Sequence, residues 1–277
     1  MTEDSKRKIR TLIIFILIVG ILVSGYFILK SGLDYYRSRA LYEDIKSRYV
    51  VENKSNIIVS TENDLSATTA DNANPSAEET HERAAWSRKL IINLEGLQEE
   101  NSDIIGWLYF ENEDISYPIL YSGDNETYLK TSYLHEYLFA GSIFMDENNI
   151  PDFSSDHTIL YGHNMNDLSM FGRLRYYYQK NDYYDGHRYF QIITNEYYYR
   201  YEIIAYKQVP DTSDFYTTFF STRDDFETFI NDKVLRGSMI NSGVNVTSDD
   251  SIVSLSTCSS EGYRFVVSAV RIATEVR

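Results

Sequence analysis

The single cysteine of this chain stands near an arginine in an arrangement that suits acyl transfer. Residues 252–258 form an apolar, strand-like segment that ends on Cys258, and Arg264 opens the next such segment six residues later. If a short loop joins the two strands, Cys258 and Arg264 lie at the same end of the pair. A guanidinium beside a thiol favours the reactive thiolate. It can also donate to an oxyanion that develops on a substrate carbonyl.

His163 supplies a group that can give and take a proton in such a reaction. It follows the strand-like segment 157–161, and Gly162 between them allows the chain to turn. An imidazole within hydrogen-bond reach of a reacting amine can serve as general acid and then as general base. Cys258, His163 and Arg264 are therefore the candidate catalytic residues.

Short β-like runs with turn-rich connections follow residue 101 and must position these side chains. About eight strands indicate a mainly β fold with helices, a closed or nearly closed barrel. Helical patches are expected at 168–178 and 223–237, the second in the connection before the cysteine strand. Apolar spacing from Trp86 to Leu97 predicts an N-terminal helix that packs on the barrel. The strands are predicted at 104–110, 116–121, 142–145, 157–161, 189–193, 197–209, 252–256 and 264–272.

The N-terminus carries a candidate membrane span. Residues 12–29 are eighteen uncharged, mostly apolar positions, preceded by Lys6, Arg7, Lys8 and Arg10. At about 1.5 Å per residue they cover roughly 27 Å, enough for the hydrocarbon core of a bilayer. The basic residues predict a signal anchor with a cytoplasmic tail at 1–11 and an extracellular catalytic part. A signal peptide cleaved near 23–25 is the alternative.

The remainder divides into a spacer and a catalytic domain. Residues 30–80 read as a stalk, helical over 31–51, and a polar flexible linker that cannot bury much apolar surface. Residues 81–277 form the predicted catalytic domain, including its N-terminal helix.

Composition narrows the functional classes. The chain has 26 Lys+Arg against 41 Asp+Glu, a net charge of −15, which argues against nucleic-acid binding. One cysteine allows no intramolecular disulfide. The five histidines form no metal-binding motif and there is no phosphate-binding glycine loop, so we expect no metal and no cofactor. Acidic pairs such as Asp146 and Glu147 are expected to be solvated surface.

Together these residues resemble the sortases, the cysteine transpeptidases of Gram-positive cell surfaces. The family's T-L-x-T-C signature corresponds to SLSTC at 254–258, its histidine segment to YGHNM at 161–165, and its arginine to Arg264. The resemblance spans roughly 101–272, and NSDIIGW at 101–107 and DNETYL at 124–129 look like the class B branch. Ser259 departs from several class B members, which carry an acid directly after the cysteine.

The resemblance implies a sortase-like closed eight-stranded barrel and a reaction without a cofactor. Cys258 would attack the carbonyl of a threonine in the C-terminal sorting signal of a surface protein, and His163 would protonate the leaving amine. Arg264 would stabilise the oxyanion. An amine of a peptidoglycan or lipid II cross-bridge would then resolve the thioester. The peptide contacts implied are Asn125, Leu129, Tyr161, Ser256, Phe215 and Tyr216.

Three alternatives stay open. A pilus-type sortase would join pilin subunits through a lysine amine, and a catalytically silent module would keep the barrel without the chemistry. Arg271, further along the same strand, competes with Arg264 for the role at the oxyanion, although the family places its arginine at the start of the strand. For the sorting motif we expect a pentapeptide that begins Asn-Pro or Ser-Pro and has Thr in fourth place.

Overall fold

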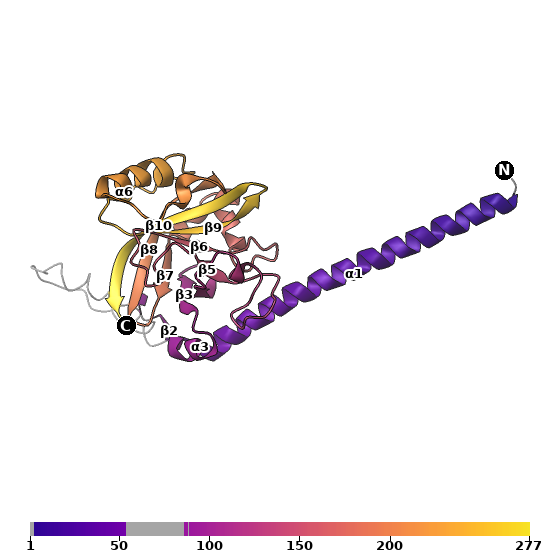
Figure 1. Cartoon of the computed structure of the whole chain (residues 1–277), viewed down its shortest axis with the longest axis horizontal. Helices are drawn as coiled ribbons and strands as arrows, with labels where there is room; N and C mark the ends of the chain where they lie inside the picture. Colours follow the sequence, from indigo (N-terminus) through magenta and orange to yellow (C-terminus); the bar gives the residue numbers. More distant parts are fainter. Residues whose placement is uncertain (1–2, 54–85, 88) are drawn as a thin grey trace, which may run out of the picture.

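The computed structural model describes residues 3–53, 86–87 and 89–277, which form a β-barrel domain and one long N-terminal helix that leaves it (Figure 1). Most of the predicted linker, and the first part of the catalytic domain as predicted from residue 81, fall on 54–85, outside the described residues.

Eight strands close into a barrel in the order β10-β8-β7-β3-β4-β5-β6-β9, which confirms the predicted fold class. The pairs β4–β5 and β6–β9 are parallel and the other six are antiparallel. All eight predicted strands are present; three have the predicted bounds, and the ends of the other five differ from them by one to four residues. Their bounds are β3 Ile104–Phe110, β4 Ser116–Leu120, β5 Ile143–Met145, β6 His157–Tyr161, β7 Tyr189–Ile193, β8 Tyr197–Pro210, β9 Ile252–Ser260 and β10 Tyr263–Val276.

Aromatic side chains fill much of the barrel interior. Phe190 stacks on Phe110 and on Tyr201, with ring centroids 5.1 Å apart in both pairs. Trp107 is fully buried, and its indole N–H donates to the hydroxyl of Ser116 at 2.9 Å. Large rings bury much apolar area, and the buried indole N–H has its hydrogen-bond partner. These contacts join β3, β4, β7 and β8 through a closely packed aromatic core.

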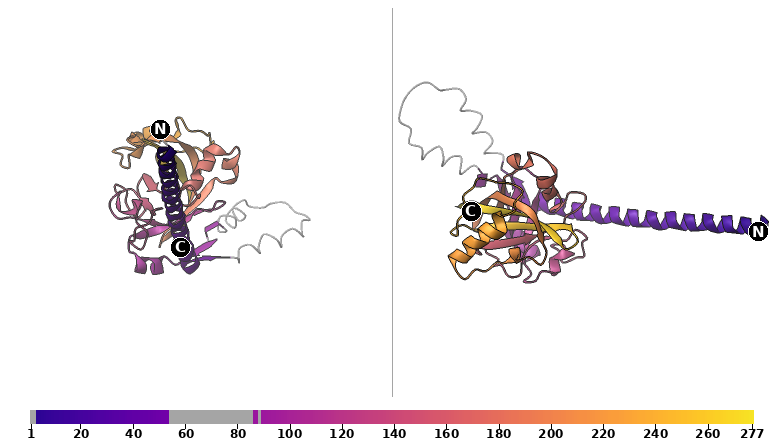
Figure 2. Two further views of the ribbon diagram at one scale, coloured as in Figure 1. Left: turned by 90° about the vertical axis from the view of Figure 1, so that its right-hand side faces the viewer. Right: turned by 90° about the horizontal axis from the view of Figure 1, so that it is seen from above.

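Helix α1 (Glu3–Tyr49) runs without interruption from the basic N-terminal segment to the barrel, and the views of Figure 1 and Figure 2 both show its N-terminal part projecting away from the barrel. An 18-residue window of it has a mean hydropathy of 3.0 and is 0% buried, so its length and composition suffice to cross a membrane. The C-terminal part of α1 packs on the domain, where Tyr42 is 3% exposed and Ile45 is fully buried. The predicted helix over 31–51 is thus present up to Tyr49 and is joined to the barrel.

The predicted helix from Trp86 to Leu97 is wrong in its middle. Leu90–Ile92 forms strand β2, which pairs with β1 (Val50–Glu52) immediately after α1. Over so short an apolar run the helical and strand periods both fit, and the available partner strand decides between them. Helix α3 (Leu94–Glu100) begins only after Asn93, whose side chain accepts from the N–H of Gly96 at 3.0 Å and caps the helix.

Helix α6 (Arg223–Phe229) confirms the helix expected before the cysteine strand. Thr222 and Asp225 form a capping box at its start, and the chain continues as a π-helical segment, η5 (Ile230–Leu235). Phe226 and Phe229 belong to a second buried cluster that packs against β8, β9 and β10 outside the main core.

The other helical prediction, 168–178, holds only in its second half. Leu168 and Met170 have φ angles of 69° and 51°, which interrupt any helix. The turns η3 (Gly172–Arg175) and α4 (Tyr176–Gln179) follow. The short segments η2 (Thr127–Leu129), α5 (Tyr183–Gly186) and η4 (Asp214–Tyr216) complete the connections.

Candidate active site

The strand register brings the three candidate catalytic residues to one end of the barrel. In the β9–β10 hairpin Cys258 pairs with Arg264, and Gly262 has a φ of 73° in the turn between them. Strand β6 lies parallel to β9 with Tyr161 opposite Ser256, so His163 and Cys258 both lie two residues beyond that pair. Strand β9 continues to Ser260, beyond its predicted end at Ser256. The side chain of Cys258 lies outside the part of the chain that the structure describes.

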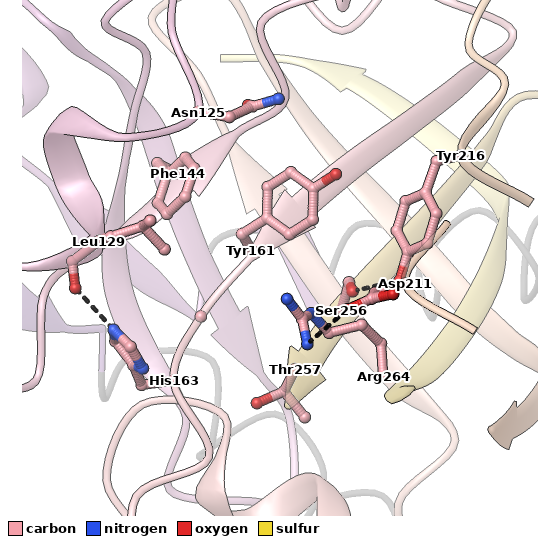
Figure 3. A pocket seen from close by; sticks show the side chains of 11 residues that line it. Asn125, Leu129, Phe144, Tyr161, His163, Asp211, Tyr216, Ser256, Thr257 and Arg264 are labelled. Atoms are coloured by element: carbon pink, nitrogen blue, oxygen red, sulfur yellow. Dashed lines mark hydrogen bonds and ion pairs between the residues drawn. The ribbon is translucent and has the colours of Figure 1, made fainter. Parts of the chain in front are cut away.

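A cavity of about 220 Å³ opens at this end of the barrel (Figure 3). Seven of the residues predicted for the site line it: Asn125, Leu129, Tyr161, His163, Tyr216, Ser256 and Arg264. Four further lining residues were not anticipated as parts of the site: Phe144, Gly162, Asp211 and Thr257. These lining residues come from segments far apart in the sequence, and the order of the strands in the barrel brings them together.

His163 is held by a backbone carbonyl. Its Nε2 lies 2.6 Å from the oxygen of Leu129, and since a carbonyl only accepts, Nε2 carries a hydrogen and donates it. On the other side, the N–H of Phe171 donates to the carbonyl of His163 at 3.0 Å. The ring is half-buried and lines the cavity.

Gly162 is required for packing. A Cβ on Gly162 would lie 2.4 Å from Cδ1 of Ile143 and 2.7 Å from the ring of Phe171. Its φ is not in the left-handed region, so the turn itself does not demand glycine. The sequence predicts that Gly162 serves the turn, whereas the structure gives a steric reason. Without a Cβ, the backbone before His163 can lie close to Ile143 and Phe171.

Arg264 carries a loosely held positive charge. Its Nη1 is 3.9 Å from Oδ2 of Asp211, and the two side chains are 32% and 36% exposed. Ion pairs that are this long and this exposed are weak. Toward the residues that the structure describes, most guanidinium N–H groups of Arg264 are therefore available for a ligand. Asp211 follows directly after β8, whose Pro210 pairs with Tyr263.

Two tyrosine side chains line the cavity beside the candidate catalytic residues. The rings of Tyr161 and Tyr216 stack with centroids 6.2 Å apart, and the hydroxyl of Tyr216 hydrogen-bonds Ser256 at 3.0 Å. On its other side the ring of Tyr161 packs against the ring of Phe144, with centroids 5.3 Å apart (Figure 3). Tyr161 also donates to Oδ2 of Asp146 at 2.8 Å. Burial, and then the negative charge of Asp146, raise the pKa of Tyr161 well above its usual value, so the phenol stays protonated.

Asp146 corrects the expectation that its acidic pair is solvated surface. Asp146 is 4% exposed, whereas Glu147 beside it is exposed. Nothing in the local sequence distinguishes the two acids, because two of the four hydrogen bonds to the Asp146 carboxylate come from Asn125 and Tyr161 in other segments.

Two predicted or rival residues lie away from the cavity. Phe215 is 1% exposed and packs edge-on against His157 and against Tyr216, with ring centroids 5.6 Å apart in both pairs. Arg271 donates to the carbonyl of Phe153 at 2.7 Å and to Tyr201 at 3.2 Å. The geometry gives Arg271 a packing role and leaves Arg264 as the arginine on the cavity.

Thr257, directly before Cys258, has a buried hydroxyl with no hydrogen-bond partner among the residues that the structure describes. Such groups are uncommon because burying them unpaired has a free-energy cost, and this one belongs to a cavity-lining residue.

Among the described residues no group of three or more His, Cys, Asp or Glu side chains could hold a metal ion. The site therefore offers a nucleophile position, an imidazole and a guanidinium around a cleft of polar aromatics.

Comparisons with known proteins agree with this arrangement. A family model described as the sortase domain matches residues 108–272. Sortase B of Listeria monocytogenes is 42% identical over 173 residues, which cover 61% of this chain and 68% of that protein. Sortase B of Staphylococcus aureus is 28% identical over 252 residues, covering 91% and 90%.

Solved structures extend the likeness to the whole domain. The crystal structure of sortase B from Bacillus anthracis in complex with AAEK1 superimposes with a TM-score of 0.67 at 28% identity, covering 87% of this chain and 98% of that one. Fold and site define a cysteine transpeptidase built on a closed barrel. The chain belongs to the sortase family, in its class B branch.

Proposed function

We propose that this chain is a membrane-anchored transpeptidase in which Cys258, His163 and Arg264 carry the chemistry. The observation that supports this most directly is the strand register. It sets Cys258 opposite Arg264 and brings His163 to the same end of the neighbouring strand, on the rim of one cavity.

The proposed reaction has two half-steps. The thiolate of Cys258 attacks the carbonyl carbon of a threonine in a C-terminal sorting signal, and Arg264 donates to the oxyanion that forms. Collapse of this intermediate breaks the peptide bond, and a proton from Nδ1 of His163 goes to the departing amine. The surface protein is then held as a thioester on Cys258.

The second half-step returns the enzyme to its starting state. His163 removes a proton from the amine of a peptidoglycan cross-bridge, which attacks the thioester and expels the Cys258 thiolate. One acyl bond replaces another, so the exchange consumes neither ATP nor a redox equivalent.

The cavity is proposed to hold the sorting peptide, a pentapeptide that begins Asn-Pro or Ser-Pro and has Thr in fourth place. Asn125, Leu129, Tyr161, Tyr216 and Ser256 line the cavity. Backbone groups of an extended peptide need donors and acceptors, and apolar side chains need aromatic walls. This lining supplies both.

Helix α1 is proposed as a signal anchor, with residues 12–29 in the membrane, 1–11 in the cytoplasm and the barrel outside. Its exposed apolar run and the four preceding basic residues support this orientation. Residues 30–80 then act as stalk and linker, and 81–277 as the catalytic domain. The C-terminal turns of α1 contact that domain through residues such as Tyr35 and Tyr42.

The test uses the full chain in detergent micelles and a library of quenched fluorescent pentapeptides. We expect cleavage after Thr, an acyl adduct on Cys258 by mass spectrometry, and faster turnover with glycine or diaminopimelate-type amines. Cys258→Ala should abolish all three.

A matched pair of variants separates the two arginines. Arg264→Lys should lower kcat/KM at least about a hundredfold, because a lysine cannot reproduce the planar donor fork. Arg271→Lys, the same change on the same strand, should keep kcat/KM within a fewfold of wild type.

Absence of cleavage and adduct across the library, with a folded chain, would leave a silent binding module. Transfer to a pilin lysine in preference to the wall-type amines would indicate the pilus-type enzyme.

A further inference from the structure

Asp146 is a buried carboxylate that no step of the proposed reaction uses. It follows β5 directly and is 4% exposed. An ionised carboxylate in such a place is tolerated only if hydrogen bonds replace its hydration. Within the described residues its hydrogen-bond donors are neutral groups of Asn125, Asn148 and Tyr161.

The two carboxylate oxygens of Asp146 have different partners. Oδ1 accepts from the backbone N–H of Asn148 at 2.9 Å and from the Asn148 side chain at 3.0 Å. These contacts close a local turn and fix the carboxylate relative to its own backbone. Oδ2 accepts from Tyr161 at 2.8 Å and from Nδ2 of Asn125 at 3.1 Å. Both of these partners line the cavity.

The carboxylate thereby fixes two cavity walls at once. Tyr161 ends strand β6, and Asn125 lies in the loop after β4, so no shared element aligns them. The amide of Asn125 is held at its other end as well, because its Oδ1 accepts from the N–H of Glu147 at 3.0 Å. Tyr161 stands between Phe144 and Tyr216 (Figure 3). A change in its hydroxyl contact would tilt the ring and alter the width of the cleft.

We propose that Asp146 is a positioning residue that sets peptide affinity in this cavity by orienting Tyr161 and Asn125 through Oδ2. The inference rests on the proposed role of the cavity as the sorting-peptide site. Charge-assisted hydrogen bonds are stronger than neutral ones, so a carboxylate holds the two side chains more firmly than an amide can.

Asp146→Asn is the informative substitution because it keeps size and shape. All four contacts to Asp146 come from donors, and an asparagine must turn its NH₂ group toward one pair of them. If the NH₂ group faces Tyr161 and Asn125, both lose their acceptor; if it faces Asn148, both keep only a neutral acceptor, which is weaker than the carboxylate. Glu147→Gln is the matched control, since it removes the charge from the adjacent, exposed acid.

The measurements separate affinity from chemistry. For the pentapeptide that the wild-type full chain cleaves best in the quenched library, Asp146→Asn should raise KM about tenfold and change kcat less than twofold. Alkylation of Cys258 by iodoacetamide, which needs no ordered peptide cleft, should keep its rate. Glu147→Gln should leave all three quantities unchanged.

A second background tests the route of the effect. In a chain that already carries Tyr161→Phe and Asn125→Ala, Asp146→Asn should change KM less than twofold, because its partners are gone. An equal rise in KM in both backgrounds would overturn the proposal. So would a parallel fall in kcat and in the alkylation rate, which marks a general structural defect.

The remaining outcomes are also decisive. If Asp146→Asn does not fold, Tyr161→Phe alone should raise KM severalfold at an unchanged alkylation rate, and an unchanged KM overturns the proposal. If the wild type cleaves no peptide, the proposed function fails and this inference falls with it. If the wild type cleaves and Asp146→Asn has the KM of wild type, the positioning role alone is refuted.

Discussion

His157 gives the stability of the barrel a pH dependence whose size follows from its surroundings. It is 0% exposed, with Nδ1 2.8 Å from the carbonyl of Thr217 and Nε2 2.8 Å from the hydroxyl of Ser254. Its ring packs against Phe215 and Phe229, at centroid distances of 5.6 and 4.9 Å. Burial lowers the pKa of His157 to about 4, although the Thr217 carbonyl and the charge of Asp146 oppose the shift.

The direction and size of the effect follow from proton binding. In the unfolded chain His157 takes up a proton as the pH falls below about 6.5, whereas the folded chain resists until about pH 4. The unfolded state therefore binds more protons across this window, and the free energy of unfolding falls as the pH is lowered. At about 1.4 kcal/mol for each pH unit, the full loss is about 3 kcal/mol.

The perturbation is His157→Asn, which removes the titrating group and leaves an amide to donate toward Thr217. It should lower stability at pH 7.5 by about 2 kcal/mol through lost ring packing, typical of a reduced core side chain. Between pH 6.5 and 4 it should lose about 3 kcal/mol less than the wild type does.

Urea unfolding of the full chain in detergent, followed by the fluorescence of buried Trp107, measures both quantities. His135→Asn is the matched control, because His135 is exposed and its φ of 57° is one that asparagine tolerates. The control should keep the pH dependence of the wild type. Identical curves for His157→Asn and wild type between pH 6.5 and 4 would refute the argument from burial.

Two further substitutions test particular contacts by the same unfolding assay. Tyr42→Phe deletes the hydroxyl that lies 2.6 Å from the Gly141 carbonyl and 3.0 Å from Ser142, and should lower the free energy of unfolding by about 1–3 kcal/mol. Tyr36→Phe, at a 72% exposed position of the same helix, should change it by less than about 0.5 kcal/mol, and equal effects would contradict the assigned role of Tyr42. Thr257→Val replaces a buried hydroxyl that has no partner within the described part of the chain, and it should leave stability unchanged or raise it by up to about 1 kcal/mol; a clear loss would mean that the hydroxyl is bonded.

Much of the barrel could be predicted because β-strands have a recognisable pattern in the local sequence. Runs such as 157–161 and 189–193 combine apolar residues with turn-rich flanks, and both strands have the predicted bounds. The prediction of one helix from Trp86 to Leu97 was wrong because the pattern of the three residues Leu90–Ile92 is too short to distinguish a helix from a strand. Their partner β1 lies about forty residues earlier in the chain.

The candidate site divides in the same way. Cys258, His163 and Arg264 stand out by residue type, by their position at strand ends and by resemblance to a family. Asp211 and Phe144 have no such signal, because an acid after a strand or a phenylalanine within one is ordinary in most folds. They reach the cavity only through the order in which β5, β8 and β10 enter the barrel.

The sequence by itself determined the chemical inventory: one thiol, an imidazole after a strand, an arginine at the start of another, and an apolar helix at the N-terminus. The tertiary structure decided which polar groups meet. Asp146 and Glu147 are neighbours of the same type, and only Asp146 is buried, since Tyr161 and Asn125 reach it from segments 15 and 21 residues away. Tyr42 likewise meets Gly141 across 99 residues. A side chain's environment is set by the groups that folding brings to it, and those groups are not written next to it in the sequence.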